Sequence, residues 1–104
     1  MFGYVKKDKV KKAIEDELKI YVALMDGSAN DVRQLARGIM DGEHYRRYVE
    51  DYIDEMQPLW IHKDHSIAQC AALNEACESY NHWRICCITL RDLLLQMTYE
   101  PVKL

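Results

Sequence analysis

Glycine, proline and surplus positive charge are all scarce in this sequence. Four Gly and two Pro among 104 residues leave too few turns for an all-β fold of many short strands. The net charge is -3, whereas a protein that binds nucleic acid through its phosphates usually carries a basic surplus. No run of about 18 apolar residues and no signal-peptide stretch occurs, so we expect a cytoplasmic protein with reduced cysteines and no membrane contact.

What the sequence does contain is apolar residues at helical spacing. Apolar residues make up 49% and charged residues 30% of the chain, which is typical of one globular domain, here residues 1–104. The spacing predicts an all-α bundle of about four helices, at residues 8–25, 29–40, 43–56 and 66–98, with a connection over 57–65. Asp26-Gly27 and Asp41-Gly42 are expected to end the first two helices, because Gly readily adopts the left-handed C-terminal conformation. Pro58 ends the third.

The last predicted helix is the longest, since residues 66–98 contain neither Gly nor Pro. At 1.5 Å per residue it is about 50 Å long, so it either breaks near Tyr80 or forms a spine for the shorter helices. Ile88 and Leu95 form a second apolar strip, separate from the broad face that carries Leu90 and Leu94. A helix that is apolar on two sides must be covered on two sides. The cover is either the rest of the bundle or another protein chain.

Aromatic residues suggest which chain surfaces meet a partner. Seven Tyr and two Trp are many for this length, and both types are enriched at interfaces, although they also line cores. We therefore expect a non-enzymatic protein–protein interaction or adaptor module, which forms a homodimer through its C-terminal helix or binds another protein. The predicted interface residues are Tyr45, Tyr48, Tyr52, Trp60, Trp83, Ile88 and Leu95.

A metal- or small-ligand-binding helical protein is the first alternative, with His62, His65, Cys70 and Cys77 as candidate zinc ligands. Their spacing departs from known zinc sites, since no CxxC pair is present. Cys70 and Cys77 are two helical turns apart, about 10 Å along the axis. Buried cysteines are more often small core residues than ligands. We therefore expect no cofactor.

Two further functions, catalysis by a cysteine and DNA binding, are weighed on other residues. His82 and Cys86 are one turn apart on a helix, but no oxyanion site or Gly-rich phosphate loop accompanies them, so no enzymatic activity is expected. Residues 28–56 have the scale of a helix-turn-helix DNA-binding regulator, with Arg46 and Arg47 near the start of its second helix. Acidic residues on that helix and the lack of a basic surplus argue against nucleic acid as a partner.

Overall fold

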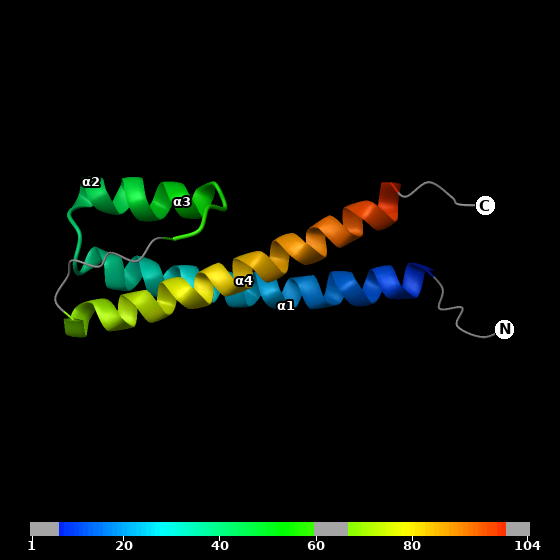
Figure 1. The fold of residues 1–104 in the computed structure, drawn as a ribbon, viewed down its shortest axis with the longest axis horizontal. Helices are drawn as coiled ribbons and strands as arrows, with labels where there is room; N and C mark the ends of the chain where they lie inside the picture. Colours follow the sequence, from blue (N-terminus) through cyan, green and yellow to red (C-terminus); the bar gives the residue numbers. More distant parts are fainter. Residues whose placement is uncertain (1–6, 60–66, 100–104) are drawn as a thin grey trace.

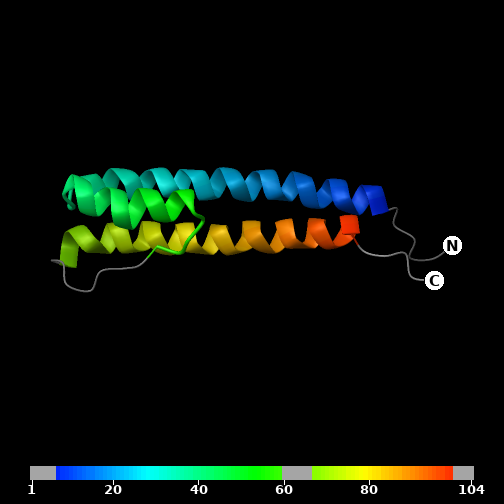
Figure 2. The same ribbon diagram turned by 90° about the horizontal axis from the view of Figure 1, so that it is seen from above.

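The chain folds into a long antiparallel hairpin of two helices, with a short helix packed against one end (Figures 1 and 2). This computed structural model describes residues 7–59 and 67–99. The hairpin helices are α1 (Lys7–Arg37) and α4 (Ile67–Tyr99). The middle helix runs through α2 (Gly42–Tyr45), the π-helical turn η1 (Arg46–Glu50) and α3 (Asp51–Asp54). The described part of the chain is therefore all-α, as expected, but it has three helices rather than four.

The predicted break at Asp26-Gly27 is wrong, because residues 8–25 and 29–37 belong to the single helix α1. A Cβ added at Gly27 would meet nothing within 4 Å, so this residue faces open space. Gly inside a helix costs about 1 kcal/mol relative to Ala, and burial on both sides of Gly27 offsets that cost. The buried stripe crosses it at helical spacing as Met25, Ala29, Val32 and Ala36.

The middle helix begins at Asp41-Gly42, where the sequence predicts the end of one helix and the start of the next. Asp41 caps it, since its Oδ1 accepts hydrogen bonds from the backbone N–H groups of Glu43 (3.1 Å) and His44 (2.9 Å). At the other end Met56 has a left-handed φ of 57°. The Met56 N–H donates to the Ile53 carbonyl and the Gln57 N–H to the Tyr52 carbonyl. This pair of hydrogen bonds forms a Schellman motif, which usually has Gly at the left-handed position.

Helix α4 is continuous from Ile67 to Tyr99, so the predicted break near Tyr80 is wrong. It is not a spine for several short helices, because α1 is nearly as long and packs along it. Tyr80 is only 1% exposed in the core, and Cys77 before it and Cys87 after it on α4 are buried in the same cluster. The observed bounds agree with the predicted 66–98 to within one residue. Most of the predicted connection over 57–65 lies outside the described residues. No helix in the described ranges is long and apolar enough to cross a membrane.

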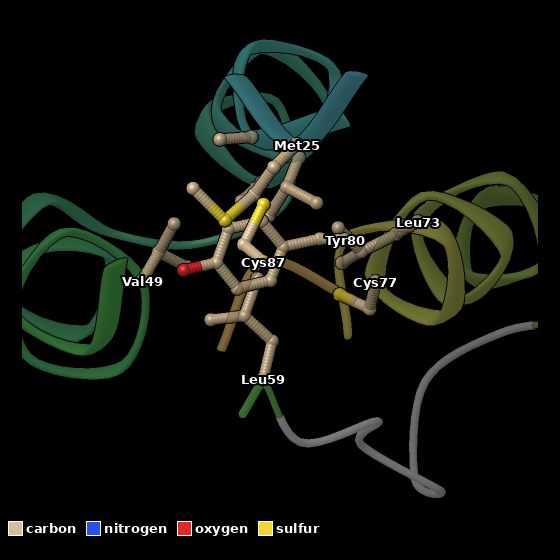
Figure 3. Packing of buried hydrophobic residues seen from close by; sticks show 10 residues of the cluster. Met25, Val49, Leu59, Leu73, Cys77, Tyr80 and Cys87 are labelled. Atoms are coloured by element: carbon tan, nitrogen blue, oxygen red, sulfur yellow. The ribbon is translucent and has the colours of Figure 1, made fainter. Parts of the chain in front are cut away.

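The core lies at the end of the hairpin that the middle helix covers (Figure 3). There α1, α4 and the middle helix converge, and Leu59 closes the cluster from below in Figure 3. One polar atom is out of place: among the described residues, nothing accepts or donates a hydrogen bond to the buried Tyr80 hydroxyl. The buried residues are Met25, Ala29, Val32, Ala36, Val49, Leu59, Leu73, Cys77, Tyr80 and Cys87.

The hairpin has two unlike halves. We call residues 8–24 and 88–97 the open half, because none of their side chains is buried and the middle helix does not reach them (Figure 1). The remainder, with the middle helix and the core, is the covered half. The molecule measures 61 × 21 × 19 Å, with a radius of gyration of 18.1 Å. A compact domain of this length has a radius of about 13 Å, so the open half is a bare helix pair.

Candidate interaction surface

Two polar clusters connect the middle helix and the residues after it to the long helices. The first cluster ties the middle helix to α1. Glu50 Oε1 lies 3.3 Å from Arg33 Nε and 3.9 Å from Arg37 Nη2. The Tyr45 hydroxyl donates a hydrogen bond to the same carboxylate, and Arg37 lies over the Tyr45 ring at 5.2 Å. Burial, followed by this hydrogen bond, raises the pKa of Tyr45. These contacts hold the middle helix on one side of α1.

The second cluster ties the chain after α3 to α4. The Asn81 amide bonds both backbone groups of Leu59, at 2.7 Å to its N–H and 2.9 Å to its carbonyl oxygen. Arg84 Nε donates to the Met56 carbonyl. Continuing from Asn81 and Arg84 by steps of three and four residues leads to Ile88 and Leu95, which therefore lie on the same side of α4. The predicted strip thus continues the side that residues 56–59 cover.

The side of α1 that the middle helix covers also continues into the open half. Steps of three and four residues lead back from Arg33 to Val22, Lys19 and Glu15. A shallow hollow lies there, lined by Val22, Lys19, Glu15 and Leu18. We call this hollow together with the Ile88–Leu95 strip the open groove.

Apolar side chains are exposed along most of the open half. Leu95 is 50% exposed and Val22 is 37% exposed, while Ile88 is half-buried. Of the eight large hydrophobic side chains exposed in the described residues, only Tyr48 and Ile85 lie outside the open half. The other six are Val10, Ile20, Val22, Leu24, Leu93 and Leu95.

The structure does not bring the predicted interface residues together on one surface. The three tyrosines belong to the middle helix, at the opposite end of the hairpin from Leu95 (Figure 1). Tyr45 and Tyr52 are half-buried against the core, and only Tyr48 is exposed. Trp83 packs on Tyr21 with ring centroids 5.5 Å apart. Trp60 lies outside the described residues.

The candidate zinc ligands are only partly visible. His62 and His65 lie outside the described residues, as does the side chain of Cys70. Cys77 is buried, and burial raises the pKa of its thiol to about 11, which disfavours the thiolate that binds metals. Within the described ranges no three His, Cys, Asp or Glu side chains gather into a metal-binding group. Zinc binding therefore stays an untested prediction.

The helix-turn-helix and thiol patterns also have definite positions. Residues 28–37 are the last third of α1 rather than a separate short helix, so the predicted pair of short helices over 28–56 is not formed. DNA binding itself stays untested. Cys86 Sγ lies 3.9 Å from His82 Nε2, as their spacing predicts, and Cys77, Cys86 and Cys87 are free thiols.

Charge in the open half is balanced. Residues 8–24 carry four basic and four acidic side chains, and residues 88–97 carry only Arg91 and Asp92. Neither sign of charge therefore dominates this surface.

Comparison with models of protein families, with curated proteins and with solved structures found no match to this chain.

Proposed function

We propose that this protein is a self-associating helical interaction module, and that two copies pair through their open grooves. The observation that carries the proposal is that no side chain of residues 8–24 and 88–97 is buried among the described residues. On the side of the hairpin where the middle helix packs, this open half presents Val22, Ile88 and Leu95, with Arg91 between the last two. Two helix pairs that meet along such a side form a four-helix arrangement, a common way to bury apolar helix faces.

The amount of surface supports a partner of substantial size. The accessible surface of the chain is 7969 Å², against roughly 6,100 Å² for a compact protein of 12.3 kDa. The excess of roughly 1,900 Å² belongs to the whole elongated chain, and it leaves room for a standard interface, to which each partner contributes roughly 800 Å². A second copy can therefore cover the open groove without unfolding either hairpin.

Charge balance supports a second copy as that partner. Because the open half has no net charge, two identical open halves do not repel each other. Its acidic and basic residues alternate along α1, from Lys11 and Lys12 through Glu15 and Asp16 to Lys19. In a symmetric pairing residue i of one copy meets residue j of the other, and j meets i, so the basic residues of one copy can lie opposite the acidic residues of the other.

The absolute mass in solution, measured by light scattering behind a sizing column, tests the proposal. We expect a mass of twice 12.3 kDa for the wild-type chain, and a shift toward the monomer for Leu95→Glu alone and for the double variant Val22→Glu, Leu95→Glu. These changes replace apolar side chains of the groove with carboxylates, so pairing would bury less apolar surface and would have to desolvate a charge. A wild-type chain that stays monomeric at high concentration would overturn the proposal.

Leu93 supplies a matched control. It is 40% exposed, close to the 50% of Leu95, but the two residues are two positions apart and their side chains leave α4 on opposite sides. Leu93→Glu therefore adds the same charge at the same level of the helix, outside the open groove. We expect Leu93→Glu to remain dimeric. If only Leu93→Glu dissociates the dimer, the copies meet through the other side of the hairpin.

A further inference from the structure

A cavity of about 190 Å³ lies within the covered half, where all three helices meet. Its walls come from α1, the turn after it, the middle helix, residue 59 and α4. Five of the lining residues are buried and form its floor. These are Val32, Val49, Leu59, Leu73 and Cys77.

The rim of the cavity carries its aromatic and polar groups. Tyr48, Tyr52, Met40 and Asn74 complete the lining, and none of these four is fully buried. The rings of Tyr48 and Tyr52 lie 6.4 Å apart and are tilted by 56°. Aromatic rings in such positions favour offset or edge-to-face contact with another ring. The rim therefore favours a flat aromatic guest over an aliphatic chain.

The polar groups on the lining are few and uncharged. Asn74 supplies the one amide side chain on the lining, and an amide can both donate and accept a hydrogen bond. Burial raises the pKa of Cys77 to about 11, so its thiol is neutral at physiological pH. No lysine, arginine, aspartate or glutamate lines this cavity in the described residues. A charged guest would therefore be buried without a counter-charge, which is costly.

From these walls we infer that the cavity binds a small, uncharged aromatic molecule with one hydrogen-bonding group directed at Asn74. The volume sets the size class. An engineered apolar cavity of about 150 Å³ binds benzene, so 190 Å³ accommodates a single ring with a small substituent or a compact fused pair of rings. The ring packs against Tyr48 and Tyr52, and its apolar edge meets the buried floor. This site is independent of self-association, because its lining and the open groove share no residue.

Indole is a suitable probe, since it is flat, neutral and carries one N–H group. We expect it to shift the methyl NMR signals of Val32, Val49 and Leu73 in the wild-type chain. Nuclear Overhauser contacts to the Tyr52 ring are also expected. Benzoate, which is aromatic but charged, should shift none of these signals. If indole at its solubility limit leaves the floor methyls unchanged, or shifts the open-half residue Leu95 equally, the inference is overturned.

A variant pair then locates the site by mutation. Cys77→Leu fills part of the cavity and should weaken indole binding roughly tenfold or more, because overpacking leaves no room for the guest. Cys86→Leu makes the same change on the same helix outside the lining and should bind as the wild type does. Equal affinity of Cys77→Leu and the wild type would overturn the inference. Because the contacts to wild-type protein are measured separately, poor folding of Cys77→Leu does not remove the test.

Discussion

The substitution Gly27→Ala tests whether α1 is continuous or ends at Gly27, because the two cases predict opposite changes in the free energy of unfolding. If α1 is continuous, Gly27 occupies the interior of a 31-residue helix. An added Cβ would meet nothing within 4 Å there, so the methyl group causes no clash. If the helix instead ended at this Gly in solution, the residue would take the left-handed conformation that ends many helices.

The expected magnitude follows from helix propensity alone. Ala is favoured over Gly by about 0.8–1.0 kcal/mol in a helix interior, and no packing change opposes this gain. The continuous helix therefore predicts that Gly27→Ala raises the free energy of unfolding by about 1 kcal/mol. A left-handed Gly27 predicts the opposite sign, because Ala in that conformation costs roughly 1–2 kcal/mol. The two outcomes differ by at least about 2 kcal/mol.

Urea unfolding followed by circular dichroism measures the difference. The comparison belongs in the Leu95→Glu background, so that dissociation of a dimer does not add to the unfolding free energy. Gly38→Ala is the control, since Gly38 lies in the turn after α1 and its added Cβ would make only an ordinary contact, 3.6 Å from the Leu35 carbonyl oxygen. A midpoint that falls in Gly27→Ala, with an unchanged denaturant slope, would refute the continuous helix.

Four further outcomes follow from the buried and capping groups. Tyr80→Phe removes a buried hydroxyl without a partner and should raise the unfolding free energy by about 1 kcal/mol in urea titrations; a loss would show that the hydroxyl is bonded in solution. Asn81→Ala should lower it by about 1–3 kcal/mol, because the two backbone groups that the amide holds lose their partner, and an unchanged midpoint would contradict the clamp. Among single-cysteine variants, a thiol reagent should modify Cys86 quickly and Cys77 only on unfolding, because Cys77 is buried and its pKa is raised to about 11; equal rates would contradict its burial. Hydrogen bonds from the backbone and side chain of His44 lower the pKa of Asp41. The contribution of Asp41 to stability is therefore present above its unfolded-state pKa and is lost as pH falls through the lower folded-state pKa. In Asp41→Ala the melting temperature should depend less on pH across that acidic range.

Much of the fold was predictable because it depends on local pattern. The helical spacing predicts an all-α chain with a long last helix, and Asp41-Gly42 marks a true boundary. At Gly27 the same local reasoning fails. Ala29 joins the stripe before Gly27 to the stripe after it, and its small side chain is buried to 2% exposure. The spacing Met25, Ala29, Val32 was therefore the signal for a continuous helix, and tertiary packing outweighs one unfavourable residue.

The candidate surfaces were predictable only where one helix carries them. The two apolar strips of α4 follow from its own sequence, and Leu93 and Leu95 are both exposed. Which strip continues the covered side depends on where Asn81 and Arg84 hold the chain after α3, a contact between residues more than 20 positions apart. The cavity depends on still more elements at once, since its lining comes from all three helices. No period in the sequence encodes such a junction.

The unequal halves of the hairpin make the two proposals separable. A buried core of ten residues lies between Met25 and Cys87, so the covered half can stay folded when charges are placed in the open groove. Leu95→Glu should therefore change the mass in solution without changing the affinity for indole. Cys77→Leu should do the reverse, because Cys77 lies in the floor of the cavity and outside the open half. If Leu95→Glu weakened indole binding as much as Cys77→Leu, the cavity would exist only in the assembled protein, and the covered half would not be the independent unit that its core implies.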